Sequence, residues 1–297
     1  MMTRKESFSA SLASWQSEGR FFLWKDQRIF TQCAGRTDNE ALLLIHGFPT
    51  ASWDWEAIWP TLAGHYRLLT LDMMGFGFSD KPRPYPYSIF DQADLFEDFL
   101  REQKIVSAHV LAHDYGDTVA QELLARHNEG RLSFELNSVC LLNGGLFPET
   151  HHPLLVQKLL LSPLGPLAAK LITRRGMAAS MRKIFGAATQ PSDALLDAFW
   201  QLLDHKHGRA IMPLLIRYME ERRQHRQRWV GALQQSQVPL RLINGLADPI
   251  SGAHMVRRYR ELVHGADVVE LEGVGHYPQV EAADEVVRAV QEFLARV

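Results

Sequence analysis

The 297-residue sequence contains only two cysteines, Cys33 and Cys140. Two cysteines are too few for a fold that is stabilised by a framework of disulfides. Both lie in apolar, strand-like segments. We therefore expect two buried free thiols in a reducing compartment, with a single disulfide between them as the alternative.

Long apolar runs are also missing. No stretch reaches the roughly 18 apolar residues that a membrane-spanning helix needs, and residues 153–172 are interrupted by lysine, glutamine and proline. The polar segment 1–19 has no apolar core of the kind that signal peptides carry. These absences predict a soluble, cytoplasmic protein with no membrane partner.

Charge of one sign is not in excess, because the formal net charge is −2 and the pI is near 6.7. Such a balance argues against nucleic acid or an anionic membrane as a general partner. The densest charged run, Arg217 to Arg228, mixes arginines with two glutamates and is typical of a solvated helix face.

The rest of the composition is that of an ordinary globular enzyme, with 46% apolar and 22% charged residues. The length suits one large α/β domain with an inserted lid, or two small domains. Short apolar runs alternate with amphipathic segments, which predicts a mostly parallel sheet with helices on both faces. The expected strands are 21–24, 28–33, 41–45, 66–71, 108–111, 138–142, 240–244 and 268–271, and the expected helices are 88–103, 118–127, 253–263 and 283–294.

No convincing strand occurs between Phe147 and Ser236. Helical spacing recurs there instead, at 154–161, 167–172, 194–203 and 211–235. We therefore divide the chain into a first core part (1–146), a helical cap (147–236) and a second core part (237–297). A cap at this point would cover a site at the carboxyl ends of the strands.

The most informative motif is Leu111-Ala112-His113-Asp114-Tyr115-Gly116-Asp117, between a predicted strand and a predicted helix. The small residues Ala112 and Gly116 allow a sharp turn like the nucleophile elbow, with Asp114 in place of the usual serine. A carboxylate in this position attacks carbon by displacement and forms an alkyl ester. Epoxides and alkyl halides are therefore more suitable substrates than esters.

Two further residues would complete a catalytic set with this aspartate. Asp248 follows the strand 240–244, and His276 follows the strand 268–271 in Gly273-Val274-Gly275-His276. The order nucleophile, acid, histidine is that of α/β-hydrolases. Asp248 would hold His276 in the tautomer that leaves its second nitrogen free to act as a base.

The segment His46-Gly47-Phe48-Pro49 directly follows the buried strand 41–45. An oxyanion-hole amide is expected at this place, so we assign the backbone N–H groups of Phe48 and Tyr115 to that role.

Taken in order, the motifs HGFP, DMMGFGFSD, AHDYGD, LADP and GVGHYPQVE resemble the α/β-hydrolase fold in its epoxide hydrolase and haloalkane dehalogenase branch. Within this branch, HDYGDTVAQELL and RYMEERRQHRQRWVGAL are most similar to the mesoderm-specific transcript protein group. The resemblance covers about residue 42 to the C-terminus. It implies a hydrolase without cofactor or metal, in which Asp114 forms an alkyl ester and His276 activates the water that cleaves it.

The resemblance also bears on the leaving group. Epoxide hydrolases of this branch protonate the alkoxide with cap tyrosines, and Tyr218 is the one tyrosine of the predicted cap. His151 or His152 is an alternative donor. Dehalogenases typically have tryptophan after the nucleophile and asparagine after the His-Gly pair, where this chain has Tyr115 and Phe48.

The leading hypothesis is therefore epoxide hydrolysis of a small hydrophobic substrate with water. A haloalkane or haloacid dehalogenase and a non-catalytic binding protein are the alternatives. We assign His46, Trp53, His113 and Tyr277 to the substrate pocket. The apolar segment 154–172 is expected either to line that pocket or to form a homodimer contact.

Overall fold

The computed structural model describes residues 8–297, so the first seven residues of the polar N-terminal segment lie outside the described part. Its centre is an eight-stranded sheet in the order β1-β2-β4-β3-β5-β6-β7-β8. The pairs β1–β2 and β2–β4 are antiparallel, and the remaining pairs are parallel, which confirms the mostly parallel sheet. The strands are β1 Arg20–Trp24, β2 Gln27–Ala34, β3 Ala41–Ile45, β4 Arg67–Leu71, β5 Ser107–His113, β6 Glu135–Leu142, β7 Leu240–Gly245 and β8 Asp267–Leu271.

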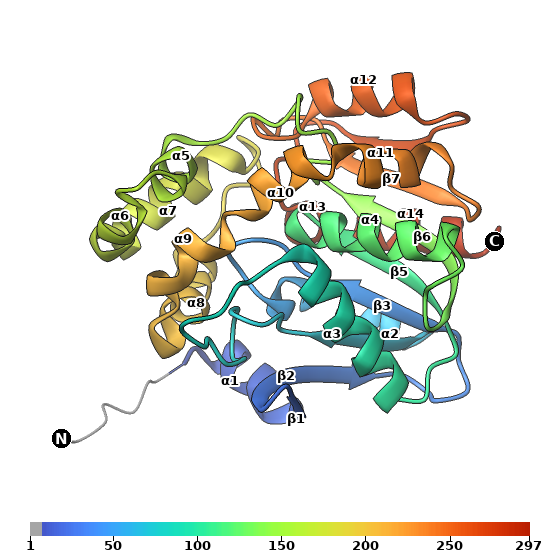
Figure 1. Cartoon of the computed structure of the whole chain (residues 1–297), viewed down its shortest axis with the longest axis horizontal. Helices are drawn as coiled ribbons and strands as arrows, with labels where there is room; N and C mark the ends of the chain where they lie inside the picture. The colour runs from blue at the N-terminus through green and yellow to red at the C-terminus, as the bar shows by residue number, and fades with distance from the viewer. Residues whose placement is uncertain (1–7) are drawn as a thin grey trace.

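The central strand β3 is buried along its whole length, and its side chains alternate between two hydrophobic cores. Leu43 and Ile45 pack in the core on one face, with α3 (Ile89–Glu102), α4 (Tyr115–Asn128), α11 (Arg226–Gln234) and α12 (Ala253–Leu262). Leu42 and Leu44 pack on the other face, with α1 (Ala10–Glu18), α2 (Trp59–Ala63) and α14 (Ala283–Leu294). Figure 1 shows α3, α4 and α11 lying in front of the sheet. Apolar cores on both faces explain why β3 is a continuous apolar run.

Between β6 and β7 the described chain forms helices and no strand, as expected. Figure 1 shows α5 to α9 gathered at one end of the sheet. The helices are α5 Leu155–Leu161, α6 Gly165–Leu171, α7 Arg174–Ile184, α8 Asp193–Asp204, the 3₁₀ segment His205–Ile211, α9 Met212–Leu215, α10 Tyr218–Gln224 and α11. The single helix predicted for 211–235 was wrong, because the chain bends near Ile216 and again at His225, giving three helices.

Two short elements complete the chain: the 3₁₀ turn Ser52–Trp55 and the helix α13, Pro278–Glu281.

Both cysteines are free, as expected, but only Cys140 is buried. Cys33 on β2 is exposed, so the expectation that it is buried was wrong. Within residues 8–297 no helix is long and apolar enough to cross a membrane.

Candidate active site

Asp114 occupies the turn between β5 and α4, where the chain reverses from strand to helix. Its backbone has φ 49° and ψ −103°, a conformation that is unfavourable for any residue with a side chain. Gly116 makes the turn sterically feasible, because a Cβ there would lie 2.3 Å from the carbonyl oxygen of Ile45. The strained turn holds the Asp114 carboxyl group at the carboxyl end of the sheet, as expected for a nucleophile elbow.

The two oxygens of the Asp114 carboxylate face different neighbours, and one of them accepts a hydrogen bond. The backbone N–H of Phe48 donates a hydrogen bond of 3.0 Å to Oδ2. Oδ1 lies 3.9 Å from Nε2 of His276. The Phe48 N–H thus lies where the sequence predicts an oxyanion-hole amide, and Oδ1 accepts no hydrogen bond from it.

His276 and Asp248 form a buried pair beside this carboxylate. Nδ1 of His276 lies 2.7 Å from Oδ2 of Asp248. Burial alone would lower the pKa of His276, but the negative charges of Asp248 and Asp114 outweigh burial and raise it to about 9. Burial would raise the pKa of Asp248, but His276 and several hydrogen bonds lower it to about 2. The resting site therefore favours a histidinium between two carboxylates.

Asn143, a residue that sequence reasoning missed, orients the Asp248 carboxylate. It follows β6 with φ 43°, and its Nδ2 donates a 3.0 Å hydrogen bond to Oδ2 of Asp248. Its Oδ1 accepts a hydrogen bond of 2.7 Å from the N–H of Gly245. Asn143 directly follows a predicted strand, as the other site residues do, and this position in the sequence could have identified it.

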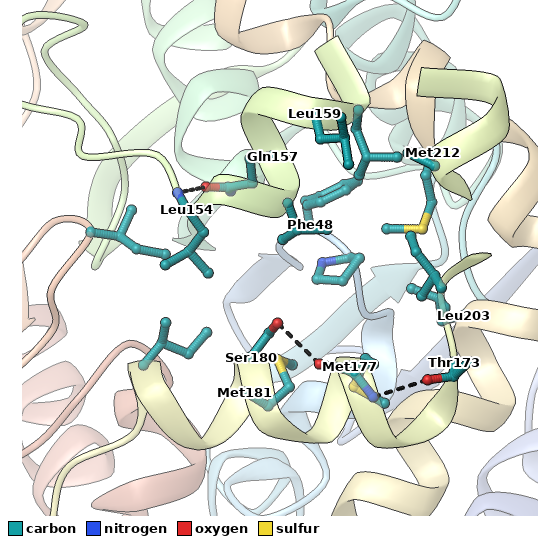
Figure 2. A pocket seen from close by; sticks show the side chains of 18 of the residues that line it. Phe48, Leu154, Gln157, Leu159, Thr173, Met177, Ser180, Met181, Leu203 and Met212 are labelled. Carbon is teal, nitrogen blue, oxygen red and sulfur yellow. Dashed lines mark hydrogen bonds between the residues drawn. The ribbon is translucent and has the colours of Figure 1, made fainter. Parts of the chain in front are cut away.

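Asp114 and His276 form part of the wall of a mainly apolar cavity of about 380 Å³. Figure 2 shows the wall provided by the helical segment, with Met177 and Met181 on α7 and Leu159 on α5 around Phe48. The cavity therefore suits a substrate with a substantial hydrophobic part.

Three other polar side chains of the wall are already engaged by backbone groups of their own helices (Figure 2). Gln157 accepts a hydrogen bond from the N–H of Leu154, Thr173 accepts one from Gly176, and Ser180 donates one to the Gly176 carbonyl. Asp114 and His276 are thus the polar groups best placed to act on a bound molecule.

Comparison with known proteins agrees with this architecture. The family model described as "alpha/beta hydrolase fold" matches residues 40–283. The chain belongs to the α/β-hydrolase fold family. It is 42% identical over 283 residues to the mesoderm-specific transcript homolog protein of Bos taurus, covering 92% of this chain and 84% of the relative. The expected similarity to this group is therefore confirmed.

A relative of nearly equal length also matches this α/β-hydrolase. The protein LipZ of Mycobacterium tuberculosis, which bears the name of a hydrolase, is 41% identical over 286 residues, covering 96% of this chain and 99% of its own. Among solved structures, a haloalkane dehalogenase DbeA variant from Bradyrhizobium elkanii superposes with a TM-score of 0.78. It has 21% identity and covers 93% of this chain and 96% of its own, a likeness that shows the shared fold.

In this α/β-hydrolase Tyr218 opens helix α10 and is 1% exposed. Its ring centroid lies 4.7 Å from that of Tyr115 and 6.1 Å from that of Phe48. Its hydroxyl has no hydrogen-bond partner among the described residues. Burial, together with the charge of Asp114, raises the pKa of Tyr218, so the hydroxyl stays protonated and can act as a donor.

Arg222 corrects the prediction that the arginine run is a solvated helix face. Its side chain is buried, because α10 packs directly against the elbow. Nε donates to Oγ1 of Thr118 at 2.6 Å, and Nη2 donates to the backbone carbonyl of Asp114 at 2.9 Å. The guanidinium also lies 4.5 Å from the ring centroid of Tyr218. The signal was the spacing, since Arg222 is one helical turn beyond Tyr218.

The two alternative donors are placed differently. His151 is partly buried with both ring nitrogens unpartnered in the described chain, and burial lowers its pKa to about 3. A Cβ on Gly145 would contact both His151 and Arg222, so these two side chains converge beside the elbow. His152 instead stacks on His254 with ring centroids 4.3 Å apart, away from the cavity wall.

None of the four residues assigned to the pocket is among the side chains that line this cavity. His46 accepts a 3.0 Å hydrogen bond from the N–H of Met73. Nε2 of His113 lies 2.7 Å from the backbone carbonyl of His276 and thus supports the loop that carries this residue.

The other two are packing residues. The Trp53 indole N–H donates to Ser11 at 3.3 Å, and its ring contacts Phe199 edge-on. Tyr277 stacks on Phe185 with centroids 5.4 Å apart, and its hydroxyl lies 3.4 Å from Oγ1 of Thr50. Aromatic side chains next to site motifs were taken as pocket residues, whereas here they fill the core below.

Within residues 8–297 no group of three or more His, Cys, Asp or Glu side chains is arranged to hold a metal ion.

Proposed function

We propose that this α/β-hydrolase converts an apolar epoxide to a diol through an ester on Asp114. The observation that carries the proposal is the carboxylate on the elbow, with Oδ2 bound to the Phe48 N–H and Oδ1 facing His276. A carboxylate attacking an ester carbonyl would form an anhydride, so the group suits attack on a saturated carbon.

In the first step Oδ1 of Asp114 attacks an epoxide carbon, and the carbon–oxygen bond of the ring breaks. The alkoxide that results takes the proton of the Tyr218 hydroxyl. Tyr218 is supported in this role by its burial, its unpartnered hydroxyl and its closeness to Tyr115 beside the nucleophile. Its proton is regained in the second step, before the next turnover.

In the second step neutral His276 takes a proton from water, whose oxygen attacks Cγ of Asp114. The Cγ–Oδ1 bond then breaks, and Oδ1 takes from His276 the proton that this residue removed from water, so the diol leaves with Oδ1. The new carboxyl group of Asp114 loses the second proton of the water, which restores the Tyr218 hydroxyl. Negative charge develops on Oδ2, where the Phe48 N–H stabilises it. Ester formation removes the charge of Asp114, one of the negative charges that raise the pKa of His276 to about 9, which favours the neutral base at the stage that requires it.

The helical segment 147–236 is proposed to act as the cap over this site. Its helices α5, α6 and α7 supply most of the apolar cavity wall. An apolar wall limits bulk water near the ester and binds a hydrophobic substrate. Helix α11, the last of the segment, packs on α4 and shares the core of the sheet.

A dehalogenase is the second candidate, because the same carboxylate can displace a halide from saturated carbon. The cavity wall in the described chain has neither a tryptophan nor an asparagine side chain. The indole N–H groups of Trp53 and Trp229 are bound to Ser11 and Glu122. Among the described residues, the cavity wall therefore lacks the tryptophan and asparagine N–H groups that would bind the leaving halide.

The test is turnover of a panel of aryl and alkyl epoxides, bromoalkanes and haloacetates, with diol and halide both quantified. Asp114→Asn serves as the matched blank, because it replaces the nucleophile by a group of the same shape. Diol without halide supports the proposal, and halide release would favour the second candidate. Neither product from a folded protein would favour a binding protein on the same fold.

A further inference from the structure

Helices α5 and α6 expose an unusual amount of apolar side chain. Of the nine large hydrophobic residues that are exposed in the described chain, five lie between residues 155 and 171. Leu155 and Leu159 are four residues apart on α5. Leu164, the N-cap of α6, is followed three residues later by Leu167 and four further on by Leu171, so the leucines of each group lie on one side of their helix. We call these five the leucine face: Leu155 (81% exposed), Leu159 (42%), Leu164 (60%), Leu167 (57%) and Leu171 (71%).

The leucine face is continuous with the cavity of the candidate active site. Leu159 and Leu171 line the cavity and are also exposed to solvent. Figure 1 shows α5 and α6 at the outer edge of the helical segment, away from the sheet. A partner that covers the leucine face would therefore lie at the entrance to the cavity.

The sequence segment that carries this face has charge of one sign. Residues 150–192 contain six lysines and arginines and no aspartate or glutamate, although the whole chain has a net charge of −2. Lys158 and Lys170 are exposed on α5 and α6, and Arg175 is exposed at the start of α7. None of these three has an ion-pair partner in the described chain, whereas Arg174 and Arg182 bind Asp197 and Asp193.

We propose that the leucine face docks on a lipid bilayer with anionic headgroups, with the cavity opening toward the bilayer. Exposed leucines beside lysine and arginine are the combination that binds a membrane interface. A second copy of this chain fits less well, because a symmetric contact through this face would place cations against cations. The helices α5 and α6 have seven residues each, so they lie on the surface and do not cross it.

The local asymmetry explains why whole-chain charge gives no sign of this partner. The docking itself does not depend on the proposed function. The statement that apolar epoxides enter the cavity from the bilayer does rest on it.

Flotation of the full-length protein with vesicles tests the docking directly. One set is phosphatidylcholine alone, and the other contains phosphatidylserine at about a third of the lipid. We expect the protein to float with the anionic vesicles and to dissociate from them as salt is raised, since exposed charge interactions are screened. No flotation with anionic vesicles would overturn the proposal.

Two variants separate the apolar and charged contributions. Leu155→Gln/Leu164→Gln/Leu167→Gln changes exposed residues that do not line the cavity and should lower partitioning about tenfold or more. Lys158→Gln/Lys170→Gln/Arg175→Gln should abolish the preference for anionic vesicles, so that partitioning into them falls by about tenfold or more.

The matched control is Leu23→Gln/Val106→Gln, which changes two exposed apolar residues elsewhere in the chain and should float as the wild type does. Equal flotation of the leucine variant and the wild type contradicts the docking. A dimer in analytical ultracentrifugation that the leucine variant dissociates, without vesicle binding, would assign the face to a second copy and also overturn it.

A kinetic comparison separates this proposal from the proposed function. With an epoxide dissolved in the vesicles, the leucine variant should lose turnover relative to a water-soluble epoxide. If no epoxide is hydrolysed but flotation behaves as predicted, the proposed reaction fails and the docking stands.

Discussion

Replacing Tyr218 by phenylalanine should affect stability and catalysis in opposite directions. The Tyr218 hydroxyl is buried without a hydrogen-bond partner among the described residues. An unsatisfied buried polar group costs about 1–3 kcal/mol, so its removal should stabilise the fold by roughly 1 kcal/mol. In a chain of this size that is about 2 °C in Tm.

The same substitution removes the proposed proton donor for the alkoxide. General acid catalysis contributes about 10²- to 10⁴-fold to a rate. We therefore expect Tyr218→Phe to form the Asp114 ester at least about 100-fold more slowly, an increase of about 2.7 kcal/mol in the barrier. The later hydrolysis of that ester should be little affected, because the Tyr218 hydroxyl has no part in it.

The assay combines thermal unfolding with single-turnover kinetics, in which ester formation and diol release are followed separately. Tyr259→Phe is the matched control. Tyr259 on α12 is also fully buried with an unpartnered hydroxyl in the described chain, but it packs near Phe147 on the face that α12 covers. This control should gain similar stability and keep the wild-type rate.

The reasoning is refuted if Tyr218→Phe opens the epoxide as fast as the wild type. The alkoxide would then take its proton elsewhere, and His151 would be the next residue to replace. Slow ester formation combined with a clear loss of stability would also contradict the account, because it would mean that the hydroxyl is bonded in the folded protein.

The remaining predictions concern Arg222 and His276. Arg222→Met removes the hydrogen bonds to Thr118 and to the Asp114 carbonyl. It should lower the free energy of unfolding, measured in urea, by about 3 kcal/mol. An unchanged free energy of unfolding would mean that these hydrogen bonds do not hold α10 against the elbow. His276, whose pKa is raised from 6.5 to about 9, should stabilise the fold by about 3 kcal/mol below pH 6.5, a contribution that is lost as the pH rises through 9. Unfolding of the wild type and of His276→Gln at pH 6 and pH 9.5 checks this, and parallel pH curves would contradict it. His276→Gln should also accumulate the ester, so a mass spectrum without the added epoxide mass on the Asp114 peptide would count against the mechanism.

The sheet could be predicted from the sequence because its strands are short, apolar and bounded by polar turns. Residues 41–45 form β3 with the predicted bounds. Helices of mixed composition were harder, and α7 (Arg174–Ile184) was missed. Its apolar set is small and its segment holds four basic residues and a glycine, so its burial against the cavity is decided by tertiary packing.

The elbow and the two residues that follow β7 and β8 could be predicted because strand ends converge in a parallel sheet. Arg222 was missed, since a charged run does not by itself show which member is buried, and its spacing from Tyr218 was the only sequence signal. Its environment comes from residues about 100 positions earlier, Asp114 and Thr118. Trp53 and Tyr277 lie next to the predicted motifs, but only the folded structure shows that their rings pack on Phe199 and Phe185 and do not line the cavity.

The central claim is that the oxygen added to the substrate comes from Asp114 and not directly from water. It is tested by a single turnover of wild-type enzyme in excess over an epoxide, in water enriched in ¹⁸O. The account predicts a diol without ¹⁸O after this first turnover, and ¹⁸O in the Asp114 carboxyl group by mass spectrometry of its peptide. A diol that carries ¹⁸O, with Asp114 unlabelled, would contradict it.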